Sequence, residues 1–285
     1  MSWHGHLSLD YHLDPHTNAP RTIAHDRHDG PLRVLQRLYP EGDAVCHHVL
    51  VHPPGGLVGG DTLDVTVHLA EGSHALVTTP GATRYYRSEG QPATQRVQAR
   101  LDDGARLEWL PLETIAYDGC IARNQLRFEL APGAQMMGWD LLALGLPAAD
   151  LAWRRGSYEQ RIELPGCWLE QARLSADDHA LLDSPLGWAG QRVLGTFWLA
   201  AGSALPRPVV EQALDAARAL LVADATCMAG TGLQAGVSAA QPSCLVLRVL
   251  APRVEPAMKL MTAVWSRWRE IAWDRVACPP RVWST

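Results

Sequence analysis

The stretch GGDTLDVTVHL, residues 59–69, leads from a glycine-rich loop into a run in which apolar and polar residues alternate. Because side chains alternate between the two faces of an extended chain, this pattern predicts a half-buried β-strand. The same period of two residues returns in TQRVQARL, residues 94–101, and in NQLRFEL, residues 124–130. The chain up to about residue 205 is therefore predicted to consist mainly of β-strands.

Short turn signals separate these runs. Each is one of the pairs EG, DG and PG, and the five pairs end at Gly72, Gly90, Gly104, Gly119 and Gly133. From Gly90 onward the interval is 14 or 15 residues, which fits either one strand out and one strand back or one coil of a stacked β-ladder. We therefore expect a mainly β, β-helix-like scaffold of stacked strands, and a β-sandwich stays open as the alternative.

Two helices are predicted near the C-terminus. The segments RPVVEQALDAARALLVAD, residues 207–224, and EPAMKLMTAVWSRWREIAW, residues 255–273, both place apolar residues on one helical face. A strand hairpin is expected between them, in residues 226–250. The prediction is a single domain over residues 1–285, β-rich over about 1–205 and formed by a small helix, hairpin and helix unit over about 206–285.

The overall composition excludes several classes of protein. With a formal net charge of −5 over 285 residues, the chain lacks the basic surface that nucleic-acid binding requires. It has no run of 18 apolar residues for a membrane span, and its N-terminus does not resemble a signal peptide, so a cytoplasmic protein is expected. Its six cysteines form no C-x-x-C pair, which argues against a zinc module and against a disulfide framework.

The loop HPPGGLVGG, residues 52–60, is the first candidate for chemistry. A phosphate cradle would need G-K-[ST] at the start of a helix, whereas here Asp61 follows and a strand comes next. The structural interpretation is a set of tight turns in which glycines adopt positive φ angles and Asp61 binds nearby backbone. Eleven of the twelve histidines precede residue 75, but no H-E-x-x-H pattern occurs, so surface or turn positions are expected for most of them.

Two carboxylates lie inside runs that should be buried: Asp140 in MMGWDLLALGL and Glu170 in CWLEQARL. An unpaired buried charge is costly. Each carboxylate should therefore be paired, hydrogen-bonded or lining a water-filled passage, and Arg161 or Arg173 could pair with Glu170. No G-x-S-x-G nucleophile motif occurs, and no catalytic set of residues can be assigned from the sequence.

Four motifs follow one another along the chain: HPPGGLVGGDTLDV (52–65), TTPGATRYYRSEG (78–90), LEWLPLETIAYDG (107–119) and WDLLALGLPA (139–148). In this order and spacing they resemble the urease accessory protein UreD family, called UreH in some species. The resemblance is strongest over about residues 33–175 and continues more weakly through the tryptophan-rich segment near the C-terminus. Because four collinear motifs match, the resemblance is specific.

The resemblance implies a non-enzymatic, β-helix-like scaffold that matures urease. Such a scaffold would bind UreF, which carries the GTPase UreG, and the assembly would dock on apo-urease. Nickel would pass through an internal tunnel as transient Ni²⁺, with no tightly bound cofactor, and Asp61, Asp140 and Glu170 match the acidic residues along such a route. Carboxylate and water ligands hold a divalent ion loosely enough to release it.

On this interpretation the glycines of the loop bend the backbone so that the carboxylate of Asp61 meets the passage. These glycines are Gly55, Gly56, Gly59 and Gly60. The negative lining of such a passage would also favour the arrival of a cation. The loop would then be a turn that also serves the transport of nickel.

One segment departs from the family pattern. Members usually continue the tryptophan segment as G-R-P-A-x-G-E, whereas this chain reads GLPAADL, with Leu146 where Arg is usual and Leu151 where Glu is usual. This departure weakens the prediction of a partner contact there. Trp265 and Trp268 are candidates for partner binding, since aromatic residues are enriched at interface hot spots, and core filling is the alternative for them. The C-terminal third is expected to meet UreF.

Two other functions stay open. The chain could be an interaction scaffold through which no metal passes, with nickel moving between other subunits. It could also, as the least favoured alternative, be a β-solenoid enzyme that acts on carbohydrate through paired acids such as Asp61 and Asp140. A retaining glycosidase would need those carboxyls about 5–5.5 Å apart and an inverting one about 6.5–9.5 Å.

Overall fold

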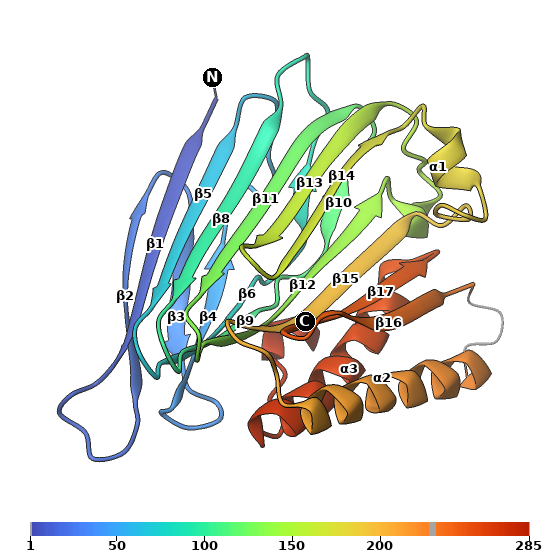
Figure 1. Cartoon of the computed structure of the whole chain (residues 1–285). Coiled ribbons are helices and arrows are strands. Elements are labelled where there is room, and N and C mark those ends of the chain that lie inside the picture. The colour runs from blue at the N-terminus through green and yellow to red at the C-terminus, as the bar shows by residue number, and fades with distance from the viewer. Residues whose placement is uncertain (1, 228–231, 285) are drawn as a thin grey trace.

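The computed structural model describes residues 2–227 and 232–284, and two facing β-sheets make up most of it (Figure 1). The first sheet has seven strands. In spatial order they are β14 (Trp168–Ser175), β13 (Gly156–Leu164), β11 (Cys120–Leu130), β8 (Ala93–Leu101), β5 (Thr62–Leu69), β1 (His4–Leu13) and β2 (Thr22–Asp29).

The second sheet has ten strands. Eight of them form one path, which is β16 (Gln234–Gln241), β17 (Cys244–Ala251), β15 (Val193–Ala201), β12 (Gln135–Leu144), β9 (Arg106–Trp109), β6 (His74–Thr78), β4 (Val45–Val51) and β3 (Arg33–Leu38). The short strand β10 (Thr114–Ala116) pairs with β12 on one side and with β7 (Thr83–Tyr85) on the other.

The chain winds between the two sheets as a β-solenoid. In the first sheet the parallel register sets Thr62 beside Thr94 and Thr94 beside Arg123, so each of these steps is one coil. The turns at Gly72 and Gly104 stack at one end, where Gly72 N donates to the Asp103 carbonyl. The predicted mainly β, β-helix-like class is confirmed, and the interval of 14 or 15 residues proves to be half a coil, one strand and its turn.

The main apolar core fills the space between the two sheets. The predicted inward face of β5, with Leu63, Val65, Val67 and Leu69, is buried there, and Val97 of β8 packs in the same layer. Burial of about 25 cal/mol per Å² of apolar surface drives this packing, and the alternation along each strand decides which residues take part.

A second core lies on the outer face of the second sheet, where α2 (Arg207–Cys227) and α3 (Val254–Trp273) cover it (Figure 1). The expected hairpin is β16 and β17, and it extends that sheet beside β15; residues 228–231 of the expected segment lie outside the described residues. The remaining short elements are α1 (His179–Asp183), η1 (Pro147–Ala149) and η2 (Arg281–Ser284).

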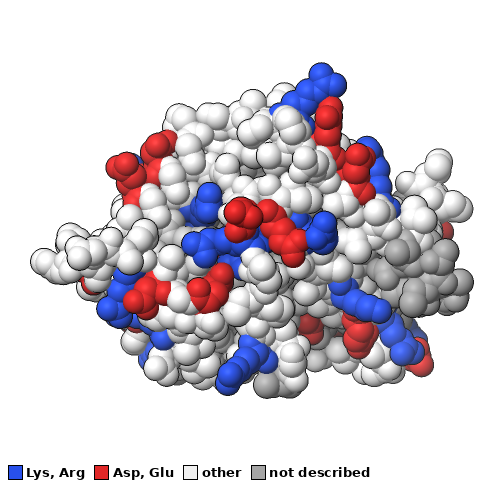
Figure 2. All heavy atoms as spheres, turned by 90° about the horizontal axis from the view of Figure 1, so that it is seen from below, with Lys and Arg blue, Asp and Glu red and all other residues white. Residues whose placement is uncertain are grey.

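The surface carries charges of both signs. On the face seen from below, Lys and Arg side chains lie next to Asp and Glu side chains (Figure 2). Among the helices that the structure describes, none is both long and apolar enough to cross a membrane.

Candidate functional site

Asp140 lies on β12 and points into the layer between the two sheets, where only 4% of its surface is exposed. Its Oδ1 accepts a hydrogen bond of 2.9 Å from Asn124 Nδ2, and its Oδ2 accepts one of 2.8 Å from Gln160 Nε2. Gln95 Nε2 in turn donates to Asn124 Oδ1 at 3.2 Å. The carboxylate is therefore held by neutral amides of the facing sheet, and none of the arginines and lysines that the structure describes is hydrogen-bonded to it.

Strand register explains why these side chains meet. Gln95, Asn124 and Gln160 are direct neighbours on β8, β11 and β13 of the first sheet. On the second sheet Asp140 is paired with Thr196 of β15, and Thr196 is paired with Arg248 of β17. Two lines of polar residues therefore face each other across the apolar layer. We define the inter-sheet polar row as these residues together with Glu170: Gln95, Asn124, Gln160, Asp140, Thr196, Glu170 and Arg248.

Burial decides the protonation of Asp140. Burial raises the pKa of this carboxyl from 3.8 to about 6, and the negative charge of Glu170 adds to the rise. The hydrogen bond from Gln160 favours the ionised form and lowers the pKa in part. Amide dipoles do not compensate a buried negative charge as a cation would. Asp140 therefore exchanges its proton close to neutral pH, and a cation that arrived beside it would take the place of that proton.

Glu170 lies on β14, at the far end of the inter-sheet polar row. Its Oε1 accepts from Thr196 Oγ1 at 3.1 Å, and its Oε2 pairs with the guanidinium of Arg248. The side chain of Glu170 is 13% exposed and that of Arg248 is 51% exposed, so the row reaches solvent here.

The suggested pairing of Glu170 with Arg161 or Arg173 was wrong. Arg161 bonds Glu163 and Gln171, and Arg173 pairs with Glu159 at 3.7 Å. The reason is the period of a strand, because residues 170 and 173 lie on opposite faces of β14. The partner is instead Arg248, which comes from the other sheet.

Asp61 holds the backbone of the glycine loop and the N-terminal segment. Its Oδ1 accepts from the backbone N of Trp3 at 2.8 Å and its Oδ2 accepts from the backbone N of Val58 at 2.9 Å, and 5% of the residue is exposed. The tight geometry of the loop requires glycine. Gly55 and Gly60 have φ angles of 78° and 94°, in the left-handed region.

The two other glycines of the loop are required by close packing. A Cβ on Gly56 would lie 2.3 Å from the ring of Tyr86, and one on Gly59 would lie 2.3 Å from Ser88 Oγ. The loop is thus a set of tight turns closed by a buried carboxylate.

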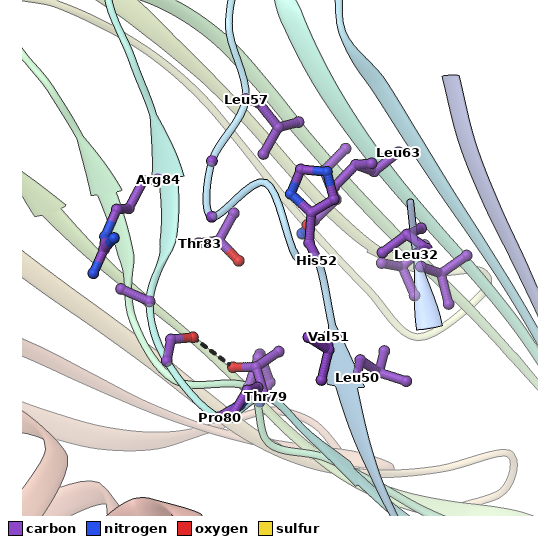
Figure 3. A pocket seen from close by; sticks show the side chains of 18 of the residues that line it. Leu32, Leu50, Val51, His52, Leu57, Leu63, Thr79, Pro80, Thr83 and Arg84 are labelled. Carbon is purple, nitrogen blue, oxygen red and sulfur yellow. Dashed lines mark hydrogen bonds between the residues drawn. The ribbon is translucent and has the colours of Figure 1, made fainter. Parts of the chain in front are cut away.

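A cavity of about 240 Å³ opens beside this loop, between the sheets (Figure 3). His52 and Arg84 lie on opposite sides of it, and the wall is otherwise largely aliphatic, with residues such as Leu32 and Leu57. Burial lowers the pKa of the His52 imidazole, against the attraction of the Asp61 carboxylate, so this imidazole is neutral at neutral pH. Gln95 also lines the cavity, which places one end of the inter-sheet polar row at its wall.

Trp265 and Trp268, predicted as partner-binding candidates, lie on α3 and face the second sheet with 0% exposure. Trp265 Nε1 donates to Glu108 Oε2 at 2.7 Å, and Trp268 Nε1 donates to the Ala213 carbonyl of α2 at 2.9 Å. Both indoles fill the second core, so any effect they have on a partner passes through the position of α3.

A buried network of charges joins α3 to the second sheet. Glu108 accepts from His74 Nε2 at 2.8 Å and from Arg269 Nε at 3.2 Å, and Arg269 also binds both carboxylate oxygens of Glu41. Burial alone would raise the pKa of Glu108, but the hydrogen bond from His74 and the positive charge of Arg269 hold it below its usual value. Burial lowers the pKa of His74 itself, so Arg269 is the lasting cation of this pair. This network is fully paired, in contrast to Asp140.

The segment that departs from the family pattern forms a short loop. Leu146 and Leu151 pair as an isolated antiparallel bridge around η1, and Leu151 is 59% exposed. Leu146 lies at the edge of a cleft of about 670 Å³ that η1 shares with the start of α3. Leu151 is therefore exposed and Leu146 is half-buried at the two positions where the family pattern would put charges.

Within the described residues, no group of three or more His, Cys, Asp or Glu side chains is arranged to hold a metal ion. The sequence reasoning missed most of the inter-sheet polar row. A signal was present: Gln95 and Asn124 occupy positions of the strand alternation where the neighbours at the same period, such as Val97 and Leu126, are apolar. A polar residue on an apolar face marks a place where polar groups meet in the interior.

Comparison with known proteins identifies the family. The family described as UreD urease accessory protein matches residues 4–284. A urease accessory protein UreD of Leptothrix cholodnii is 68% identical to this chain over 285 residues, and the aligned region covers the whole of both chains. Proteins of the same name from Albidiferax ferrireducens and Variovorax paradoxus are 55% and 54% identical, again over the whole length of both chains. The chain therefore belongs to the UreD urease accessory protein family.

Proposed function

We propose that this urease maturation factor is a cytoplasmic, non-catalytic scaffold that passes Ni²⁺ along the inter-sheet polar row toward apo-urease. In this proposal UreF binds the scaffold and carries the GTPase UreG, as the family resemblance implies. The nickel ion is cargo, so the chain needs affinity for it but no permanent site. The observation that carries the proposal is a set of oxygen-bearing side chains inside an otherwise apolar layer: Gln95, Asn124, Gln160 and Asp140 are hydrogen-bonded to one another from the cavity inward, and Thr196, the strand neighbour of Asp140, is hydrogen-bonded to Glu170 toward the surface.

The chemistry of the row suits transfer. Carboxylate and amide oxygens bind late first-row cations less tightly than imidazole or thiolate groups do, so an ion held by Asp140 and its amides would move on. With a pKa of about 6, Asp140 can exchange a proton for a cation at neutral pH.

Unsatisfied polar atoms support a hydrated path. The indole nitrogens of Trp109, at the cavity, and Trp198, near Glu170's end of the layer, are buried and make no hydrogen bond within the described residues. Buried polar groups normally find a partner, and water is the usual one when protein supplies none. An ion that kept part of its water shell would therefore meet donors and acceptors along this layer.

The two ends of the row have different roles in the proposal. At the cavity, Asp61 keeps the glycine loop in place and contributes negative potential beside the neutral imidazole of His52, a nitrogen ligand available to an arriving ion. At the surface, the guanidinium of Arg248 forms an ion pair with Glu170, and this pair must open before a cation can bind the carboxylate. Because Arg248 is half exposed, it can do so.

An interaction scaffold without metal passage is the second candidate. It is favoured by the well-anchored helical layer, in which Arg269 of α3 binds both Glu108 and Glu41. In this alternative the C-terminal third offers UreF a rigid surface, and Trp265 and Trp268 serve only to position it. The carbohydrate-enzyme alternative has no support, because backbone amides engage both oxygens of Asp61 and side-chain amides engage both oxygens of Asp140.

The deciding experiment compares Asp140→Asn and Glu170→Gln with the matched control Glu159→Gln on the outward face of β13. Each variant is co-expressed with urease, UreF and UreG, and the nickel content of purified urease is measured together with recovery of the complex. The nickel content should fall at least several-fold for the two inward variants, with the complex intact and the control unchanged. Wild-type nickel in both inward variants would favour the pure scaffold, and loss of the complex in them would show an architectural role.

A further inference from the structure

Strand β14, at the edge of the first sheet, meets β17 of the second sheet through side chains. Glu170 of β14 pairs with Arg248 of β17, and the Arg248 guanidinium lies 5.9 Å from the centre of the Trp168 ring. Trp168 in turn packs on Trp198, with ring centres 6.0 Å apart. We name the line of contact between β14 and β17 the β14–β17 seam. It is the place where the two sheets are joined near the end of the inter-sheet polar row.

Two thiols meet at one end of this seam. Cys167 lies in the turn between β13 and β14, and its Sγ is 3.2 Å from the Oγ of Ser243. Cys244 is the next residue after Ser243, and its thiol is the neighbouring group that acts most strongly on the pKa of Cys167. Cys244 is the first residue of β17 and is buried, whereas Cys167 is partly exposed. Both thiols are free, so the contact of Cys167 with Ser243 brings a thiol from the β13–β14 turn beside a thiol of β17 with no bond between the two sulfurs.

The surroundings give the two thiols different roles. The hydrogen bond from Cys244, together with the one from Ser243, lowers the pKa of Cys167 below its ordinary value, against the effect of burial. The same hydrogen bond, burial and the negative charge of Cys167 raise the pKa of Cys244, and the positive charge of Arg248 acts in the opposite direction. The accessible Cys167 is thus the thiolate that reacts first, and the buried Cys244 keeps its proton until it attacks.

We propose that Cys167 and Cys244 are a redox modification site, a dithiol that forms a reversible disulfide across the β14–β17 seam by exchange with a low-molecular-weight disulfide such as oxidised glutathione. The thiolate of Cys167 attacks one sulfur of the small disulfide, whose S–S bond breaks and releases one glutathione thiolate. Cys244 passes its proton to that thiolate, attacks the sulfur of Cys167 and releases the second glutathione, which takes up the proton that Cys167 had lost to solvent. Two protein thiols are oxidised and one small disulfide is reduced to two thiols.

The other described cysteines are poor competitors for this reaction. Cys46 and Cys120 are buried, and burial raises the pKa of each to about 11. Cys278 is partly exposed, but burial raises its pKa as well, and no second thiol is among its contacts in the described part of the chain. Cys278 is therefore the matched control, since it is a partly exposed thiol that lacks a neighbouring thiol in the described part of the chain.

The test incubates the purified, fully reduced chain with oxidised glutathione at pH 7.5 and then blocks free thiols before peptide mapping. We expect one intramolecular disulfide, Cys167–Cys244, and reversal by reduced glutathione. Cys244→Ser should instead accumulate a mixed disulfide with glutathione at Cys167, because the resolving thiol is missing. Cys167→Ser should form neither product, and Cys278→Ser should behave as the wild type.

Two measurements on the wild type avoid dependence on the variants. Cys167 should be alkylated by iodoacetamide several-fold faster than Cys278 at pH 7, and the oxidised chain should unfold at a higher urea concentration, since the bond closes a long loop. The proposal is overturned if excess oxidised glutathione leaves both thiols free, or if Cys167 pairs with any other cysteine. A mixed disulfide that persists at Cys167 in the wild type would also overturn it, because Cys244 would then not be in reach.

Discussion

The two buried layers of this protein treat acidic side chains in opposite ways. Between the second sheet and α3, Glu108 is bonded to His74 and Arg269, and its pKa is held below the usual value. Between the two sheets, Asp140 is bonded to the side-chain amides of Asn124 and Gln160 and, among the described residues, to no cation, and its pKa rises to about 6. A buried acid neutralised by a cation fastens two elements together, whereas one held by dipoles stays able to accept a proton or a metal ion.

The largest effect is expected from breaking the charge network with Arg269→Leu. The change removes the guanidinium that pairs with both Glu108 and Glu41 in a buried site, and loss of one member of a buried ion pair costs about 3–5 kcal/mol. Urea denaturation should show this loss of unfolding free energy. The double variant Arg269→Leu with Glu108→Leu should recover part of it, and no recovery would mean that packing of the arginine, and not charge, stabilises the layer.

The second prediction concerns the pH dependence of Asp140. Its pKa is higher in the folded chain than in the unfolded chain, so the folded state binds the proton more tightly and the cost of its charge is present above about pH 6. That cost, on the order of 2–3 kcal/mol, should disappear as the pH falls from 6 to 4.

Asp140→Asn isolates this contribution. The unfolding free energy of the variant minus that of the wild type should be more positive at pH 8 than at pH 4 by about the same 2–3 kcal/mol. Chemical denaturation of both proteins across this range provides the measurement. A difference that does not vary with pH would mean that Asp140 is not a strained buried acid, and the contrast with Glu108 would be lost.

A third, smaller effect is expected from Gln160→Leu. This change removes the donor to Asp140 Oδ2 and leaves a buried carboxylate oxygen unsatisfied, which costs about 1–3 kcal/mol. Gln98→Leu, on the exposed face of β8, is the matched control and should change stability by less than about 0.5 kcal/mol. Equal effects of the two substitutions would indicate that the amide does not support the carboxylate.

The smallest effect is expected where a charge pair is exposed. Arg267 and Glu270 pair on the solvent face of α3, with side chains 53% and 37% exposed. Arg267→Ala should lower stability by no more than about 0.5 kcal/mol, because water screens such pairs. A loss comparable to that of Arg269→Leu would show that the solvent face of this helix, and not its buried face, carries the stabilising charges.

Local patterns were sufficient for the elements and for a mainly β protein with a helical end, although they left a β-sandwich open beside the stacked scaffold. The alternation in residues 63–69 and the turn glycines Gly72 and Gly104 predict strands and their ends, and the helical stripe containing Trp265 and Trp268 predicts a helix with one buried face. These predictions depend on periods of two and 3.6 residues, which neighbouring residues alone define. Burial of Asp140 could be expected for the same reason, from the apolar run around it.

What a buried group bonds to could be decided only by the tertiary structure. The donors to Asp140 come from strands 16 and 20 residues away, Glu170 finds Arg248 at a separation of 78, and Arg269 reaches Glu41 at a separation of 228. Each meeting depends on the register of the coils and on how the sheets face each other. The sequence by itself determined that this chain is mainly β with a helical end and with acids inside apolar runs, and the parallel register showed that its strands stack in coils. Packing decided which acid is neutralised by a cation and which is not, because that depends on groups that no local period brings together.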